Sequence, residues 1–133
     1  MHVASGMDSA MKFFVSGKIG VEHNANAAMT ALKNAGHEIT FDWTSISHLR
    51  PYDLNSSASR EAAIKESRGI KDADVLVVMA HDKGVGMYVE LGIAIGCGVP
   101  VRVVTDADSR TMFFHHPLVK KVSSIEDVIR EFS

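Results

Sequence analysis

The sequence predicts an α/β fold, a doubly wound parallel sheet with helices covering both faces. Short apolar runs typical of buried strands alternate along the chain with segments of helical apolar spacing. One such run, at residues 75–80, leads through a glycine-bearing loop directly into an apolar helix. The 133 residues suit one domain. We expect that domain at residues 11–133, after a flexible leader or cloning remnant at residues 1–10.

The N-terminal part of the chain contains two predicted strands and a helix between them. Residues 12–16 are apolar and read as the first strand. Residues 24–34 repeat alanine and leucine at helical spacing, and Gly36 is expected to end that helix as a C-cap glycine. Residues 38–43 alternate in polarity and are predicted to form the second strand.

The middle of the chain begins with a long polar loop, predicted at residues 44–59. Loops of this length are usually functional or disordered. A helix is expected at residues 60–67, the third strand at 75–80, an apolar helix at 87–96 and the fourth strand at 99–104.

The C-terminal part is less regular until the last helix. Residues 106–117 are mixed, and residues 118–122 are predicted to form a short fifth strand. Ser123 and Glu126 have the spacing of a capping box, which predicts the start of the final helix.

Composition excludes several classes of partner. Apolar residues make up 46% of the chain and the formal net charge is −2, so nothing indicates a polymeric nucleic acid or a membrane as partner. No apolar stretch approaches the roughly 20 residues of a spanning helix, and no signal-peptide pattern is present. The single cysteine, Cys97, fits a reducing, cytoplasmic compartment and is expected to be buried in its apolar helix.

Common nucleotide and metal motifs are absent. The Gly-Lys pair at 17–18 is followed by Ile19 rather than Ser or Thr, so it is not a P-loop, and the glycine loop at 84–86 breaks the dinucleotide pattern. His115 and His116 are adjacent and therefore point apart, and no Cys, His or acidic cluster has ligand spacing. We therefore expect neither a metal nor another cofactor.

Glu90 is the most informative residue of the sequence. It stands in the apolar helix at 87–96, where a carboxylate is costly unless it is paired or needed. Because Glu90 lies near the start of a helix that follows a strand, its side chain is expected to face the crevice where open α/β sheets bind ligands. Glu90 is thus a candidate nucleophile or base, and the alternative is that it caps the helix or pairs with a basic residue.

Four segments together resemble the nucleoside 2-deoxyribosyltransferase family, including the related 2′-deoxynucleoside 5′-phosphate N-hydrolases. They are Phe-Phe-Val-Ser-Gly-Lys at 13–18, Gly-His-Glu-Ile at 36–39, the stretch from Glu66 to Val75, and Gly-Met-Tyr-Val-Glu-Leu-Gly at 86–92. The last is the most specific. The resemblance covers roughly residues 12–105.

The resemblance implies a flavodoxin-like sheet of order 2-1-3-4-5 and cleavage of the bond between a sugar C1′ and a base nitrogen. It places the nucleophile on Glu90 and the second carboxylate, which handles the base and its proton, on Glu66, where the family usually has Asp. Asp82 is the nearest counterpart of a further family Asp. The alternative to a catalytic role is that Glu66 is a solvated charge beside Lys65 or Arg68.

Several residues are candidates for substrate binding. Glycine turns and nearby lysines offer backbone N–H groups and positive charge to a 5′-phosphate, and aromatic rings offer a surface for base or sugar. The candidates are Ser16, Gly17, Lys18, Trp43, Asp82, Gly84, Gly86 and Tyr88, with Lys83 beside them and His37 and His48 as weaker candidates.

Breaking an N-glycosidic bond requires a carboxylate that traps the sugar and an acid that protonates the departing base. A retaining pair of carboxyl groups is expected to lie about 5–5.5 Å apart. The substrate is expected to be a small nucleoside or nucleotide, and transfer and hydrolysis both stay open. A non-catalytic nucleotide-binding or sensing domain is the alternative, because a fold alone does not confer chemistry.

A homodimer or larger homo-oligomer is also expected. Ile93, Ile95 and Val99, with Met87 nearby, could extend beyond the core into a symmetric interface.

Overall fold

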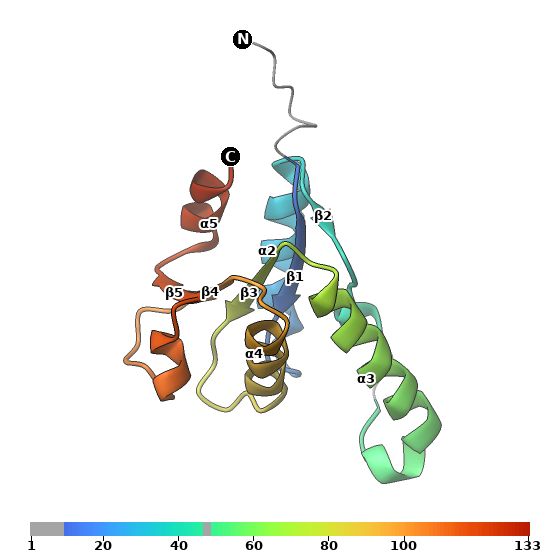
Figure 1. The fold of residues 1–133 in the computed structure, drawn as a ribbon. Helices are drawn as coiled ribbons and strands as arrows, with labels where there is room; N and C mark the ends of the chain where they lie inside the picture. Colours follow the sequence, from blue (N-terminus) through green and yellow to red (C-terminus); the bar gives the residue numbers. More distant parts are fainter. Residues whose placement is uncertain (1–9, 47–48) are drawn as a thin grey trace.

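The protein contains a five-stranded, fully parallel sheet of order β2-β1-β3-β4-β5 (Figure 1), which confirms the predicted fold class. The computed structural model describes residues 10–46 and 49–133. His48 and nearly all of the expected leader lie outside the described residues. The strands are β1 (Lys12–Ser16), β2 (Glu38–Ile39), β3 (Val75–Met79), β4 (Val101–Val104) and β5 (Val119–Val122).

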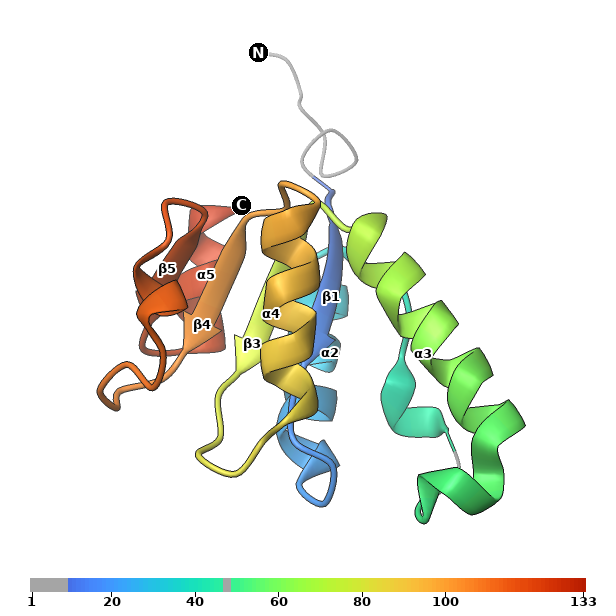
Figure 2. The same ribbon diagram turned by 60° about the horizontal axis from the view of Figure 1, so that its bottom comes forward.

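Helices cover both faces of this sheet, α3 and α4 on one and α2 and α5 on the other (Figures 1 and 2). Their bounds are α2 (Glu22–Asn34), α3 (Ser56–Lys71), α4 (Gly86–Gly96) and α5 (Ile125–Glu131), with short 3-10 segments η1 (Trp43–Ser45), η2 (Tyr52–Asn55) and η3 (Met112–His115). Within the described part of the chain, no helix combines the length and apolar character needed to cross a membrane.

The core is built around the two central strands. Phe14 pairs in register with Leu76 and Val15 with Val77, and all four side chains are fully buried. Strands buried on both faces read as continuous apolar runs, which is why both were recognisable in the sequence. The same register brings Ser16 beside Val78 at the carboxyl edge of the sheet.

The second strand is shorter than predicted because its polar groups bond elsewhere. β2 ends at Ile39 rather than at residue 43. Thr40 Oγ1 donates to the Gly69 carbonyl, and Asp42 accepts from the Thr44 N–H and so caps η1. Trp43 Nε1 donates to the Val15 carbonyl at 2.7 Å. These contacts turn the chain inward over β1 instead of extending the sheet.

The helix boundaries also differ from those predicted. α3 begins at Ser56 and ends at Lys71, so it takes up part of the long loop. The last helix is capped by Ser124, whose side chain accepts from the Asp127 N–H, rather than by Ser123 and Glu126. The expected C-cap glycine after α2 is confirmed, since Gly36 has φ +94°.

Two expectations about α4 and its C-terminal end need correction. Cys97 is exposed rather than buried, because it follows the last turn of α4 at the far end of the sheet from Glu90. Met87 and Val99 are buried in the core, and Ile93 and Ile95 pack partly against it. These four side chains therefore supply little free apolar surface.

Candidate active site

A cleft of about 500 Å³ opens at the carboxyl edge of the sheet. The loops after β1 and β3 line it together with Glu66 of α3 and Glu90 of α4. This edge is where open α/β sheets bind ligands. Its lining residues are Gly17, Lys18, Ile19, Trp43, Arg50, Tyr52, Glu66, Lys83, Gly84, Val85, Gly86 and Glu90.

Glu90 lies at the bottom of this cleft, half-buried, in the second turn of α4. Its Oε1 accepts a hydrogen bond of 2.6 Å from Ser16 Oγ, at the end of β1. The apolar neighbours Met87, Leu91 and Ala94 anchor α4 on the sheet and thereby aim Glu90 at the β1 end. Among the described residues, Glu90 therefore neither caps a helix nor pairs with a basic side chain.

Glu66 approaches Glu90 from the other side, from the middle of α3. Burial raises the pKa of Glu90 from 4.5 to about 9, and a hydrogen bond and charge repulsion from Glu66 contribute in the same direction. The Ser16 hydroxyl acts in the opposite sense and lowers that pKa. The balance of these effects favours the protonated form of Glu90.

The two carboxyl groups of Glu66 and Glu90 share one cleft. Both line it, and the raised pKa of Glu90 reflects an interaction with Glu66; a retaining pair with a sugar between its members is spaced by about 5–5.5 Å. Glu90 is held by the hydrogen bond from Ser16, so Glu66 is the member that can swing aside when a ligand enters.

Cationic side chains line the rest of the cleft. Lys18 follows β1, and its Nζ donates to the Ile19 carbonyl at 2.8 Å. Lys83 lies in the loop after β3, and Arg50 comes from the segment before η2. Together with the N-terminal end of α4, they supply positive charge around a carboxyl pair.

A smaller, mostly apolar pocket adjoins the cleft and shares Glu66 with it. Trp43 and Tyr52 contribute aromatic rings to both. The indole of Trp43 is held by its bond to the Val15 carbonyl, and Ile46 and Leu49 complete the apolar wall.

The structure brings most of the predicted site residues together. Glu90, Glu66, Gly17, Lys18, Trp43, Gly84 and Gly86 all line the cleft. Ser16 lies behind the cleft surface, fully buried, with its hydroxyl on Glu90.

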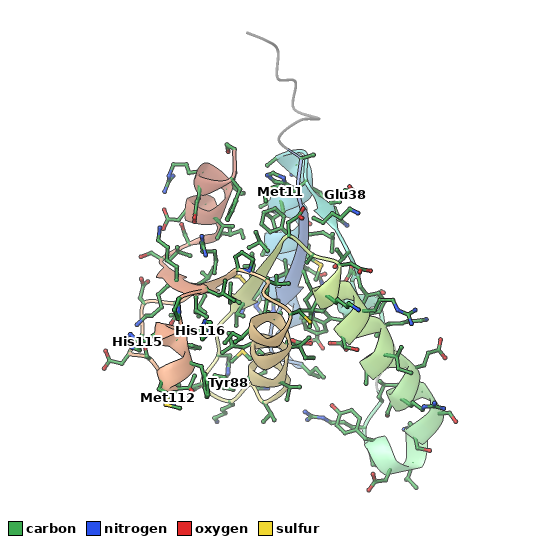
Figure 3. All side chains as sticks on the ribbon, in the orientation of Figure 1. Met11, Glu38, Tyr88, Met112, His115 and His116 are labelled. Carbon is green, nitrogen blue, oxygen red and sulfur yellow. The ribbon has the colours of Figure 1, made fainter. Side chains whose placement is uncertain are left out.

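Asp82 and Tyr88 lie apart, along a neighbouring shallow groove. Asp82 is within ion-pair distance of His81, 3.2 Å, and of Arg110, 3.8 Å. Tyr88 stacks on Phe114 with ring centroids 6.2 Å apart, and Figure 3 shows it on the side of α4 that faces η3. His37 is buried against Phe13, at the opposite end of β1 from the cleft.

Sequence reasoning missed Arg50, Tyr52, Ile19 and Val85 as lining residues. For Arg50 and Tyr52 the available signal was the length of the polar loop, which marked the segment as functional without marking which side chains it delivers. Among the residues that the structure describes, no group of three His, Cys, Asp or Glu side chains is arranged to hold a metal ion.

The fold and the site define a flavodoxin-like α/β protein with two carboxyl groups, those of Glu66 and Glu90, in a cleft at the carboxyl edge of its sheet. No family model and no curated protein matches the sequence. Solved structures do share the fold. One is the CMP N-glycosidase BcmB of Clostridium botulinum, with a TM-score of 0.59 and 11% identity over 90% of this chain and 96% of that one. Another is a conserved protein of Enterococcus faecalis V583, with a TM-score of 0.59 and 16% identity over 92% of this chain and 97% of that one.

Proposed function

We propose that this protein is an enzyme that cleaves the N-glycosidic bond of a nucleoside or its 5′-monophosphate through covalent trapping of the sugar by Glu90. The observation that carries the proposal is that Glu66 and Glu90 line one cleft, with Glu90 held by Ser16. We infer that the two carboxyl groups share one proton. A reaction that needs one anionic and one protonated carboxyl group finds both in such a pair.

In the first step, an oxygen of Glu90 bonds to the sugar C1′ while the bond from C1′ to the base nitrogen breaks. The electron pair of that bond leaves with the base, and Glu66 delivers the shared proton to it. The products are a glycosyl ester on Glu90, a neutral base and an ionised Glu66.

In the second step, water attacks C1′ and Glu66 takes one of its protons. The ester bond to Glu90 breaks, and the free sugar leaves with retained configuration. If a second base reaches C1′ before water, the same ester gives a new nucleoside. Hydrolysis and transfer therefore use the same residues and differ in what enters the cleft after the first base departs.

A 5′-monophosphate is the form of substrate that the charges favour. Lys18, Lys83 and Arg50 line the cleft around the acidic pair, and a substrate dianion would match them. The backbone at Gly84 and Gly86 leads into the N-terminal end of α4, which adds partial positive charge. The fold neighbour named as a CMP N-glycosidase is in keeping with a nucleotide substrate.

The apolar pocket beside Glu66 is the proposed site of the base. Trp43 and Tyr52 offer ring faces for stacking, and Glu66 lies where the pocket and the cleft meet. Base and acid would then be neighbours when the C1′–N bond breaks.

The proposal is tested by chromatographic detection of free base from a panel of nucleosides and their 5′-monophosphates, with and without a second base. We expect base release from a monophosphate without an acceptor. Glu90→Ala should lower turnover by at least about a thousandfold. Glu61→Ala is the matched control, because Glu61 is an exposed carboxylate on α3 that pairs with Lys65 at 2.9 Å.

Each outcome of the panel distinguishes between a hydrolase, a transferase and a binding domain. Product formation only with an acceptor base would make the enzyme a transferase. Unchanged turnover in Glu90→Ala would refute the role of Glu90. Saturable nucleotide binding without base release from any substrate would favour a binding or sensing domain on the same scaffold.

A further inference from the structure

Ser16 is the last residue of β1 and a completely buried polar residue beside the candidate nucleophile. Its backbone is fixed by the pairing of β1 with β3, where it lies opposite Val78. Its Oγ donates to Glu90 Oε1 at 2.6 Å, across 74 residues of sequence. The sequence suggested Ser16 as a phosphate ligand, but in the structure its hydroxyl is engaged with Glu90 and lies away from the cleft surface.

The groups around Glu90 act on its protonation in opposite directions. Burial and Glu66 favour the protonated carboxyl, while the hydrogen bond from Ser16 favours the carboxylate. The short distance and full burial of Ser16 make that bond a fixed part of the site rather than a contact that solvent can replace. The charged side chains that share the cleft with Glu90 are Glu66, Lys18, Arg50 and Lys83.

We propose that Ser16 is the positioning residue of Glu90: its hydroxyl holds Oε1 and stabilises the carboxylate when the shared proton passes from Glu90 to Glu66, so that Oε2 is left to attack C1′. The transfer moves one proton between two carboxyl groups and leaves the net charge of the pair unchanged. That proton is the one later delivered to the base. The catalytic consequence rests on the proposed function, whereas the effect of Ser16 on the protonation of Glu90 does not.

Ser16→Ala removes the hydroxyl with almost no change of shape. We expect kcat to fall roughly 10- to 100-fold, since a hydrogen bond to a charged group is lost. KM should stay nearly constant, because Ser16 does not line the cleft. The alkaline limb of the pH profile should move upward from about 9, since the group that lowers the pKa of Glu90 is gone.

Two variants that keep a donor serve as rescue. Ser16→Thr retains the hydroxyl and should keep the wild-type pH profile. Ser16→Cys retains a weaker donor and a similar size, so an intermediate shift is expected if the added methyl of Thr does not fit. Thr40→Val is the matched control, because it deletes a hydroxyl that donates at 2.8 Å to the uncharged Gly69 carbonyl.

A measurement independent of turnover separates this inference from the proposed function. The side-chain carboxyl carbons of ¹³C-labelled glutamate are titrated by NMR, with the Glu90 signal assigned by its loss in Glu90→Gln. Ser16→Ala should raise the titration midpoint of Glu90, and Thr40→Val should not. If the midpoint rises but the wild-type protein turns over no substrate, the proposed function is refuted. The inference that Ser16 stabilises the Glu90 carboxylate then still stands. An unchanged midpoint in folded Ser16→Ala would overturn the inference even if the enzyme is active.

Discussion

At the scale of single residues, the site depends on a carboxyl group in an unfavourable place. Glu90 is half-buried, accepts from one hydroxyl and faces a second carboxyl group. A group held in this way is available for chemistry because its surroundings stabilise neither of its forms fully. The same arrangement should reduce the stability of the fold around neutral pH.

Glu90→Gln is therefore expected to raise the melting temperature at neutral and alkaline pH. The pKa of Glu90 is raised from 4.5 to about 9, so the folded state holds a proton that the unfolded state releases. The stabilisation from that proton is complete below pH 4.5 and is lost as the pH rises through about 9. Glutamine carries no such proton, so its advantage over wild type should grow across that window.

Thermal denaturation of both proteins at pH 4.5, 7 and 9 measures this difference. Glu61→Gln, at an exposed position, supplies the baseline. A difference between Glu90→Gln and wild type that does not change with pH would contradict the expected linkage.

At the scale of secondary-structure elements, α3 depends on a close approach to the sheet. A Cβ built on Gly69 would lie 3.0 Å from Phe41 Cβ and 3.1 Å from the buried ring of Phe14. Glu66 stands on the same helix, about one turn earlier, so the packing at Gly69 also fixes the distance between Glu66 and Glu90.

Gly69→Ala is expected to lower the free energy of unfolding by about 1–3 kcal/mol, because the helix must move away from β1 to admit the methyl group. It should also lower turnover by displacing Glu66. Gly92→Ala on α4 is the control, since nothing lies within 4 Å of the added Cβ, and helix propensity should raise stability by up to about 1 kcal/mol. Equal stability changes in the two variants, followed by chemical denaturation, would refute the packing argument.

Elements with a strong apolar pattern could be predicted from the sequence, and elements set by polar contacts could not. β1 and β3 were predicted to within one residue because strands buried on both faces are continuously apolar. β2 was predicted too long, because the bonds of Thr40 and Trp43 to distant carbonyls leave no local signal.

The residues of the candidate site also divide into those that local sequence pattern predicts and those that it does not. Glu90 was recognisable because a carboxylate in an apolar helix is anomalous, and the resemblance to a known family supplied Glu66. The hydrogen bond from Ser16 to Glu90 and the delivery of Arg50 and Tyr52 to the cleft depend on how the sheet brings remote segments together. Local pattern carries no information about such long-range contacts.

At the scale of the whole molecule, one end of the fold is incompletely covered. Figure 1 shows the N-terminal half of α3 extending beyond the body of the domain together with η2. Leu54 is 82% exposed there, and Val89 on α4 is 61% exposed, with Tyr52, Ile64 and Val85 also exposed. The exposure of Leu54 on this protruding end makes it a candidate interaction surface.

We expect the chain to form a homodimer through this end, with a mass in solution of twice 14.4 kDa. Leu54→Lys should shift the protein toward monomer, as measured by light scattering after size-exclusion chromatography. Met112→Lys is the control, because Met112 is 76% exposed but lies on η3, away from α3 (Figure 3). A monomer at all concentrations, or equal effects of the two variants, would count against this surface.

The exposed thiol at the end of α4 allows ligand binding to be followed by fluorescence energy transfer. The sequence has one cysteine and one tryptophan, Cys97 and Trp43, and the tryptophan lines the cleft. α4 has 11 residues, so Cys97 lies about 16 Å along its axis from the end that borders the cleft. A fluorophore coupled to that thiol would receive excitation energy from a single indole donor. Ligand entry could then be followed in the native sequence, without introducing or removing any residue.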